Sequence, residues 1–265
     1  MKRVVLTTRR APSSLAGLLQ ELELRQPKVV TGKEMAEVIA GSGSHLTAEV
    51  AVERLVREGW LSPLRTRDAW EFIPASRAGR YPSGDPWIEL RALLARKPDA
   101  PVAIAFASAV WELGYGTHQP SRPTFAHRPG WRPPRALSDA RSVSFDWRLP
   151  AGQKDRLPVW QPATVVVATA HRPECQDNWG NADDWLPETM GAVTPTDVLT
   201  EARDRGTATL ARLGYLAEWS GRDDIVEVLQ PLLPERLPVT FLGPREPRGR
   251  WIKRWRLYDS LLPSR

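Results

Sequence analysis

Cysteine is almost absent from this chain of 265 residues, whose single thiol is Cys175. A lone cysteine excludes an internal disulfide, which fits a reducing compartment. Long hydrophobic runs are missing too: the sequence has no stretch of about 18 apolar residues, the length that a membrane-spanning helix needs. The N-terminal segment also shows no signal-peptide cleavage site. We therefore expect a cytoplasmic protein with no membrane partner.

Enzyme signatures are absent as well. The sequence has no G-x-x-x-x-G-K-[ST], G-x-G-x-x-G or G-x-S-x-G motif. His171, Cys175 and Asp177 have a spacing that suggests metal ligands, but zinc sites use paired ligands and no second cysteine or histidine lies near. Asp183 and Asp184 could serve metal-dependent phosphoryl chemistry, although a helix N-terminus explains them more simply. We expect no catalysis, no metal and no cofactor.

What the chain does have is positive charge. Its 37 lysines and arginines exceed its 31 acidic residues, which gives a net charge of +6. A basic chain favours polyanionic partners such as nucleic acid, or an acidic protein surface. The length predicts about two domains. The 25 prolines and 12 tryptophans predict irregular loops around large buried rings.

Three segments near the N-terminus have apolar residues at helical spacing. They span residues 12–25, 31–41 and 47–59. In the second segment, Thr31 forms a T-x-x-E capping box with Glu34, and Gly41 is expected to end the helix. In the third, Thr47 is the expected cap, and Gly59 supplies the left-handed residue that ends the helix.

A hairpin is expected after the third helix. Residues 60–64 and 69–73 alternate like strands, and Pro63 confines the first of them to a sheet edge. The residues between them, 65–68, are polar, and we expect all four to be exposed. Three short helices followed by a hairpin is the order of a winged helix-turn-helix, in which one helix enters the major groove and the hairpin, or wing, reaches neighbouring phosphates.

The same pattern assigns a DNA-binding face. In the third helix, Val50 is placed to meet a thymine methyl group, and Arg54 or Arg57 to reach guanine or phosphate. Helix N-termini and a basic wing tip suit phosphates. The predicted DNA-binding residues are Lys33, Ser44, His45, Thr47, Val50, Arg54, Arg57, Arg65 and Arg67. Glu49 and Glu53 would repel DNA, and winged helices also serve as protein-interaction modules, so that alternative stays open.

The rest of the chain follows a segment rich in proline, glycine and serine, residues 74–87. We predict an α+β protein with a winged helix-turn-helix domain at residues 1–80 and a larger mixed α+β C-terminal domain at residues 81–265. Residues 164–169 are β-branched, as in strands, but Pro162 favours a helix there. The other expected elements are helices at 86–96, 102–114, 184–192, 196–205, 207–219 and 223–232, strands near 124–126 and at 142–149, and an antiparallel hairpin of 238–242 with 251–262.

A basic strip lies near the C-terminus, with Trp251 and Trp255 between its cations. The cations are Arg245, Arg248, Arg250, Lys253, Arg254 and Arg256. The strip could bind nucleic acid or dock an acidic partner. Equally, it could be a solvated face whose tryptophans belong to the core.

Six segments together resemble a known family in their order and spacing. They are VVTGKEM (29–35), VERLVREGWL (52–61), AWEFIP (69–74), DPWIELRALLAR (85–96), ASAVWELGY (107–115) and RLGYLAE (212–218). The chain resembles the AbiEi-family antitoxins of type IV toxin–antitoxin and abortive-infection systems, and it is most similar to the mycobacterial branch.

This resemblance implies a function for each domain. The winged helix-turn-helix domain would bind inverted repeats in the promoter of its own operon, with residues 48–58 as the recognition helix and residues 60–73 as the wing. The C-terminal domain would neutralise a cognate toxin, an AbiEii-like nucleotidyltransferase. Such antitoxins are not generally enzymes. We expect a chain that is monomeric alone and pairs on promoter DNA.

Overall fold

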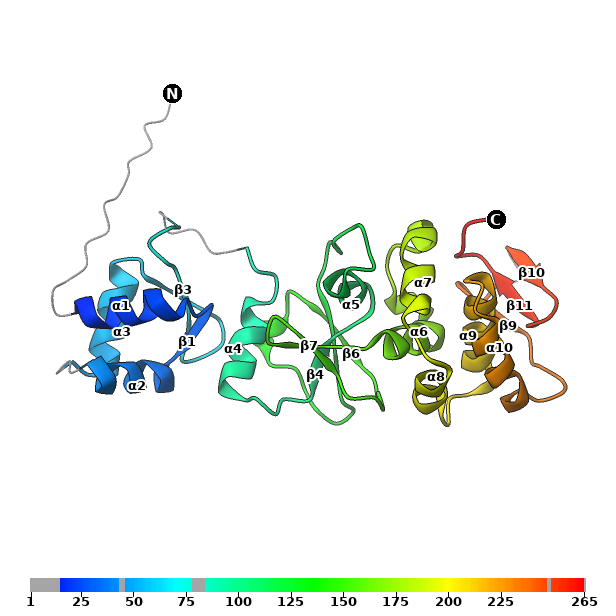
Figure 1. The fold of residues 1–265 in the computed structure, drawn as a ribbon, viewed down its shortest axis with the longest axis horizontal. Helices are drawn as coiled ribbons and strands as arrows, with labels where there is room; N and C mark the ends of the chain where they lie inside the picture. Colours follow the sequence, from blue (N-terminus) through cyan, green and yellow to red (C-terminus); the bar gives the residue numbers. More distant parts are fainter. Residues whose placement is uncertain (1–14, 43–45, 78–83, 247–248, 265) are drawn as a thin grey trace, which may run out of the picture. The chain divides into compact units, whose positions relative to one another are not determined.

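The structure is a computed structural model that describes residues 15–42, 46–77, 84–246 and 249–264 (Figure 1). The chain forms two compact units, Met1–Ala100 with Pro134–Leu137 and Pro101–Pro133 with Ser138–Arg265. Both units contain helices and strands, so the predicted α+β class is confirmed. Every helix among the described residues is too short or too polar to cross a lipid bilayer.

The first unit begins with the element order of a winged helix-turn-helix. Its elements are α1 (Ala16–Arg25), β1 (Val29–Thr31), α2 (Gly32–Ser42), α3 (Ala48–Arg57), β2 (Leu61–Pro63), β3 (Ala69–Phe72), α4 (Ile88–Arg96) and the 3-10 helix η2 (Arg135–Leu137). The predicted helices and hairpin are therefore confirmed. The sequence patterns missed β1, because it is a strand of three residues that runs directly into the cap of α2.

The strands of this unit form one antiparallel sheet in the order β1-β3-β2. β2 and β3 are the wing hairpin, with Leu61 opposite Phe72 and Pro63 opposite Trp70. β2 lies at the edge of the sheet. The edge position expected for Pro63 is thus confirmed, since a residue without a backbone N–H fits only where no further strand pairs.

Both faces of the sheet are covered. On one face, leucines of α1 and α3, including Leu18, Leu22 and Leu55, pack with Phe72 in a buried cluster. On the other, Ala92 of α4 is buried in a smaller cluster with residues of β1 and β3. Because helices cover both faces, the wing has a rigid base from which its tip projects.

The start of α2 follows the prediction and its end does not. Glu34 accepts a hydrogen bond from the Thr31 backbone N–H at 2.7 Å, and the Thr31 hydroxyl accepts one from the Glu34 N–H at 3.2 Å. This pair is the reciprocal capping box. The expected stop at Gly41 is wrong, because the helix continues through Gly41 to Ser42.

The position of α4 bears on the domain boundary. The predicted domains, residues 1–80 and 81–265, stay a prediction. The structure adds that α4, which follows residue 80, packs on β1 and β3 and also contacts η2. The compact N-terminal unit consequently extends to Ala100.

The second unit is built on a five-stranded mixed sheet in the order β6-β5-β4-β8-β7. The strands are β4 (Val102–Ile104), β5 (Thr124–His127), β6 (Arg141–Ser144), β7 (Gly152–Lys154) and β8 (Leu157–Val159). β4 pairs antiparallel with β5 and parallel with β8, while β5 and β6 are parallel. The strands expected near 124–126 and 142–149 are confirmed in place, although β6 ends at Ser144.

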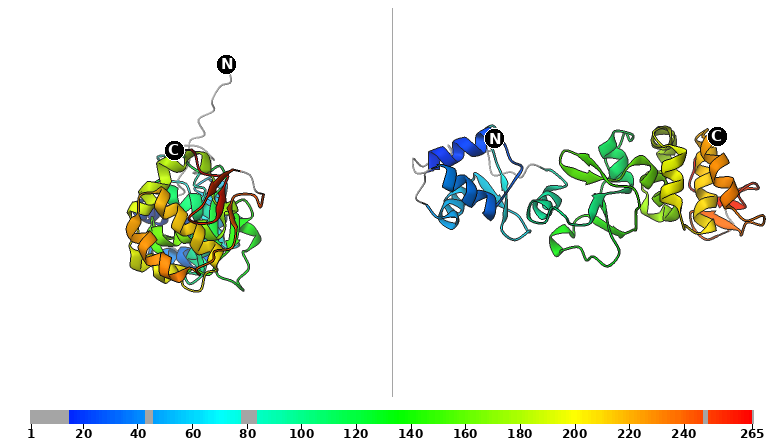
Figure 2. Two further views of the ribbon diagram at one scale, coloured as in Figure 1. Left: turned by 90° about the vertical axis from the view of Figure 1, so that its right-hand side faces the viewer. Right: turned by 60° about the horizontal axis from the view of Figure 1, so that its bottom comes forward.

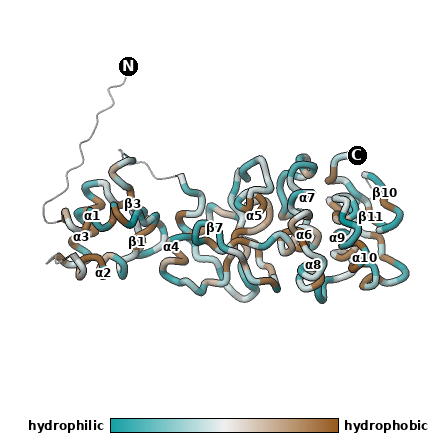
Figure 3. Tube along the Cα trace, viewed as in Figure 1, coloured by the Kyte–Doolittle hydropathy of each residue, from teal (hydrophilic) through white to brown (hydrophobic). Residues whose placement is uncertain are grey.

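The helix expected at residues 102–114 is wrong in its first part. Residues 102–104 form β4, and only Phe106–Leu113 form a helix, α5. Ile104 pairs with Phe125 of β5, so partners distant in sequence decide the strand. The predicted end at Gly114 is confirmed, because Gly114 is left-handed, with φ at 83°. Most of α5 is hydrophobic, and it is brown in Figure 3.

Helices make up much of the second unit. They are α6 (Pro162–His171), α7 (Ala182–Gly191), α8 (Pro195–Ala202), α9 (Thr207–Trp219) and α10 (Asp223–Leu229), with the 3-10 turns η3 (Pro173–Cys175), η4 (Trp179–Asn181) and η5 (Gln230–Leu232). α6 contacts α5, α7, α8 and α9, and Ala163–Ala170 is buried throughout. The helix predicted from Pro162 is confirmed, with proline in its first turn.

A second small sheet ends the chain in the order β10-β11-β9. Its strands are β9 (Thr240–Leu242), β10 (Arg250–Ile252) and β11 (Leu257–Asp259). The predicted antiparallel pairing of residues 238–242 with 251–262 is wrong, because β9 runs parallel to β11. A turn divides the second segment into β10 and β11, which pair antiparallel with each other. β9 lies against α9, and these orange and red segments stay together in both views of Figure 2.

Candidate nucleic-acid interface

Helix α3 has one face in the core and one in solvent. Ala51 and Leu55 are fully buried. At the N-terminus of the helix, the Thr47 side chain accepts a hydrogen bond from the Val50 backbone N–H at 3.4 Å. Thr47 is therefore the cap that the sequence predicts, and its role toward DNA stays a prediction.

The predicted reading face of α3 lies on the solvent side. Val50 is 37% exposed, Arg57 is exposed and Arg54 is half-buried. Glu49 and Glu53 are exposed on the same helix. Two glutamates beside two arginines make this face mixed in charge, so α3 offers acceptors for a cytosine amino group as well as donors for guanine or phosphate.

The predicted phosphate contacts near α2 are only partly described. Lys33 is exposed in the first turn of α2, where its Nζ lies 3.9 Å from a Glu37 carboxylate oxygen. Both side chains are well exposed, so this ion pair contributes little to stability and a phosphate could compete with Glu37. Ser44 and His45 lie outside the described residues.

The wing tip differs from the prediction at one residue. Arg65 and Arg67 are exposed as expected, but Thr66 is buried, with only 9% of its surface accessible. Its backbone N–H and its hydroxyl both donate to Glu89 of α4, at 3.0 and 2.8 Å. The expectation of four exposed residues is therefore wrong for Thr66, because a carboxylate from α4 binds it.

Glu89 is a residue that the sequence analysis missed. Its carboxylate also accepts the Arg65 backbone N–H at 2.7 Å, so it holds two successive residues of the wing tip. The segment DPWIELR gave no sign of this role, because the partners lie 23 and 24 residues earlier in the chain. Glu89 thus fixes the backbone of Arg65 and Thr66, while the side chains of Arg65 and Arg67 remain exposed.

The C-terminal basic strip is not one continuous charged surface. Arg250 bonds to Asp259 at 2.9 Å and to the Tyr215 hydroxyl at 2.6 Å, and both partners are buried. Arg254 pairs with Glu218 at 2.9 Å. These two arginines therefore stabilise the attachment of the small sheet to α9.

The remaining residues of the strip divide between surface and core. Arg245 and Lys253 are exposed, Arg256 is half-buried, and Arg248 lies outside the described residues. Trp255 is buried, whereas Trp251 is 42% exposed. The alternative in which the tryptophans belong to the core thus holds for Trp255 alone.

The candidate metal ligands are engaged in other contacts. His171 Nδ1 lies 3.0 Å from the Thr209 hydroxyl, and Asp177 forms an ion pair with Arg141 at 3.2 Å. Burial raises the pKa of the Cys175 thiol, which disfavours the thiolate that a metal requires. Across the part of the chain that the structure describes, no three His, Cys, Asp or Glu side chains are grouped as metal ligands would be.

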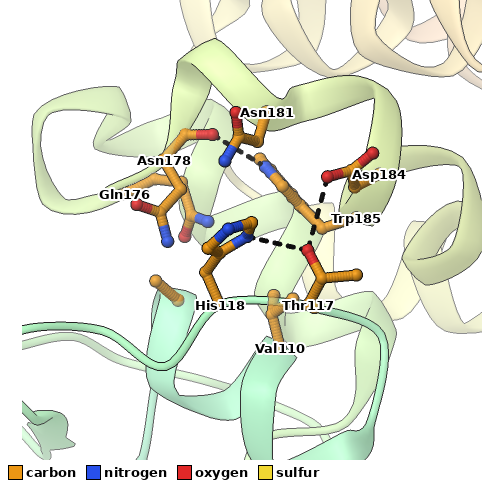
Figure 4. A pocket seen from close by; sticks show the side chains of 10 residues that line it. Val110, Thr117, His118, Gln176, Asn178, Asn181, Asp184 and Trp185 are labelled. Carbon is orange, nitrogen blue, oxygen red and sulfur yellow. Dashed lines mark hydrogen bonds between the residues drawn. The ribbon is translucent and has the colours of Figure 1, made fainter.

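A small polar pocket of the second unit is formed by the loop after α5, the segment before α7 and the start of α7 (Figure 4). The Thr117 hydroxyl lies 2.8 Å from His118 Nδ1 and 3.3 Å from an Asp184 carboxylate oxygen. If the hydroxyl donates to Asp184, then Nδ1 of His118 carries the proton and donates to Thr117. The Gln176 amide lines the same pocket, is 4% exposed and has no hydrogen-bond partner among the described residues.

Asp183 and Asp184 lie in the first turn of α7, the position that the simpler interpretation gave them. Carboxylates there interact favourably with the helix dipole. In a hydrolase, the general base lies between the nucleophile and the group that orients the base. Here Thr117 lies between His118 and Asp184, which both face it, so the three residues do not form that arrangement. The pocket can bind a small polar group through hydrogen bonds.

Comparisons with known proteins identify the second unit. The family model described as AbiEi antitoxin C-terminal domain matches residues 102–219. The crystal structure of the RV2827C protein from Mycobacterium tuberculosis is similar over 96% of this chain and 94% of that chain, with a TM-score of 0.81 and 26% sequence identity. No curated protein matches the chain.

These matches agree with the resemblance found in the sequence. The matched residues 102–219 run from β4 to the end of α9 and include the five-stranded sheet with α5 to α9. The similarity to the mycobacterial structure extends over nearly the whole chain, including the winged helix-turn-helix. Residues 102–219 therefore match the C-terminal domain of AbiEi antitoxins, and the chain as a whole is similar in structure to the mycobacterial protein.

Proposed function

We propose that the protein binds the promoter of its own operon as a repressor and neutralises a cognate nucleotidyltransferase toxin. The observation that carries the DNA half is the solvent-facing side of α3, with Val50 and Arg57 exposed beside an exposed pair of wing arginines. The match of residues 102–219 to the AbiEi antitoxin C-terminal domain supports the antitoxin half. We assign the chain no catalytic step and no cofactor.

The mechanism of repression is steric. Helix α3 enters the major groove while the wing contacts the adjacent backbone, so that the promoter is occupied. Most of the affinity comes from phosphate contacts, for which Lys33, Arg54, Arg57, Arg65 and Arg67 are the candidates. Two copies on an inverted repeat place their α3 helices about 34 Å apart, or a multiple of that distance.

A gel-shift titration on the upstream promoter fragment tests the DNA half. We expect Arg65→Ala with Arg67→Ala to weaken binding and to reduce the salt slope by about two, one for each lost phosphate contact. Arg57→Ala on α3 is expected to weaken binding to the native operator and to unrelated DNA alike, and to reduce the salt slope by about one. Arg96→Ala is the matched control, since Arg96 is exposed at the end of α4 and away from the proposed face.

The outcome separates two classes of function. Unchanged affinity and salt slope in the wing variant would remove the wing from DNA binding. If the wild-type chain bound neither the promoter fragment nor other duplexes, the winged helix would instead be a protein-interaction module. That second candidate is favoured by the exposed Glu49 and Glu53 on α3.

Co-expression tests the antitoxin half. The neighbouring nucleotidyltransferase gene is expressed with and without the full-length chain, and growth and co-purification are scored. We expect the chain to restore growth. Growth arrest in the presence of folded, abundant protein would contradict the proposal, whatever the DNA-binding result.

A further inference from the structure

The small C-terminal sheet carries three aromatic rings in one row across its strands. Phe241 of β9 is in register with Tyr258 of β11, which is in register with Trp251 of β10. The ring centroids of Trp251 and Tyr258 are 4.7 Å apart, and those of Tyr258 and Phe241 are 5.7 Å apart. Rings at matching positions of neighbouring strands lie on the same face of a sheet.

This row is on the outer face of the sheet. The residues on either side of Tyr258, Leu257 and Asp259, are buried, so alternation along the strand turns Tyr258 away from the core. Trp251 is 42% exposed, and β10 is an edge strand, so no further strand covers its outer side. A large aromatic surface is thus left in solvent at the edge of the row.

Two cations lie in the segments that connect the strands of this sheet. Lys253 follows β10 directly, and Arg245 lies in the loop after β9; both are exposed. Glu246 follows Arg245 in the same loop. Arg250 is paired with Asp259, and Arg254 is paired with Glu218. Lys253 and Arg245 are therefore the cations that we consider for ligand binding.

We propose that this face binds single-stranded nucleic acid. Trp251 stacks on an unpaired base at the open end of the aromatic row, and Lys253 and Arg245 contact the phosphates on either side. A duplex hides the faces of its bases, whereas single strands present them, and aromatic rings beside cations are the usual platform for such strands. An acidic peptide would match the cations but not the aromatic row.

The site is separate from the proposed operator-binding surface and from the matched antitoxin domain. The three strands cover residues 240–259, beyond the match that ends at residue 219. The α3 helix and the wing belong to the other compact unit. Binding at the aromatic row therefore has its own variants and its own test.

Fluorescence anisotropy with a fluorescein-labelled uridine 12-mer tests the site on the full-length protein. We expect Trp251→Leu to weaken binding about tenfold, the effect of losing one stacked base, and Trp251→Phe to retain most of it. Lys253→Gln should lower the salt slope by about one. Trp111→Leu is the matched control, because Trp111 is 37% exposed on α5.

Three outcomes would overturn the proposal. One is the absence of oligonucleotide binding by wild-type protein in low salt, and another is equal affinity in the Trp251→Leu and Trp111→Leu proteins. The third is binding of a poly-glutamate peptide in place of the oligonucleotide. Circular dichroism and thermal unfolding establish that each variant is folded.

Discussion

Glu89 holds Thr66 at the tip of the wing through two hydrogen bonds, from the backbone N–H at 3.0 Å and from the hydroxyl at 2.8 Å. A helix that follows the winged helix-turn-helix thereby fixes the shape of its wing. The wing arginines flank Thr66 on both sides, so their direction depends on this contact. Glu89 is consequently expected to affect DNA binding although it is not itself suited to contact phosphate.

Replacement of Glu89 tests this role. Glu89→Ala leaves buried Thr66 donors unpaired, and hydrogen bonds to a charged group contribute roughly 1.5–3 kcal/mol each. We expect the free energy of unfolding to fall by about 2 kcal/mol in urea denaturation, and promoter affinity to fall as well. Asp99→Ala, an exposed acidic residue near the end of the same unit, is the control. Equal promoter affinity in both variants would show that DNA binding does not depend on the contact between Glu89 and Thr66.

Gly214 of α9 is packed directly against Trp255, and a Cβ at this position would collide with the indole ring. We expect Gly214→Ala to lower the free energy of unfolding by about 1–3 kcal/mol, because overpacking displaces a buried ring. Gly191→Ala is the matched control, since nothing lies within 4 Å of its added Cβ. If both variants unfold at the same denaturant concentration, Trp255 is less tightly held than the structure indicates.

Local signals in the sequence predicted the parts of the fold that depend on near neighbours. The Thr31–Glu34 capping box spans three residues, and the side of α3 that faces solvent follows from helical periodicity alone. Proline at Pro162 likewise marked the first turn of α6 correctly against the β propensity of the segment. Each of these features is decided within one or two helical turns.

Features decided by distant partners were not predictable. Residues 102–104 are as apolar as the helix that follows, and only their pairing with β5 makes them a strand. β9 is parallel to β11 rather than antiparallel to its neighbour in sequence, because a turn at residues 253–256 redirects the chain. At the wing, the exposure of Arg65 followed from composition, whereas the burial of Thr66 depended on Glu89.

His171 is expected to make stability depend on pH. Burial, followed by the nearby arginines Arg205, Arg172 and Arg212, lowers its pKa below the ordinary 6.5. The folded chain therefore binds this proton less readily than the unfolded chain, so stability is complete above about pH 6.5 and declines as the pH falls below that value.

Urea denaturation between pH 5 and pH 8 measures this dependence, with the range taken around the ordinary histidine pKa of about 6.5. We expect His171→Gln to flatten the decline below pH 6.5 relative to the wild type. His118→Gln is the control, since His118 is exposed. A decline of the same size in both variants would place the responsible proton on another group.

Asp259 joins the last strand to α9 through a buried network. One carboxylate oxygen accepts the Tyr215 hydroxyl at 2.8 Å and pairs with Arg250 at 2.9 Å. The other accepts the backbone N–H groups of Leu261 and Leu262, each at 3.0 Å. Burial, and then the hydrogen bond and charge of Asp259, raise the pKa of Tyr215 above its ordinary value of 10.0.

Asp259→Asn should therefore act on stability and on the Tyr215 titration together. The Asp259 carboxylate is buried but Arg250 is 38% exposed, so we expect a loss of about 1–3 kcal/mol, the cost of leaving buried hydrogen-bonding groups unpaired. The loss of the carboxylate should also lower the pKa of Tyr215 toward 10.0. Thermal unfolding measures the first effect, and tyrosinate absorbance during an alkaline titration measures the second.

Asp204→Asn is the control, because the Asp204 side chain is 76% exposed in its pair with Arg148. This substitution should change stability by less than about 1 kcal/mol. A stable Asp259→Asn protein with an unchanged tyrosinate curve would mean that Arg250 and Tyr215 hold the sheet without the carboxylate.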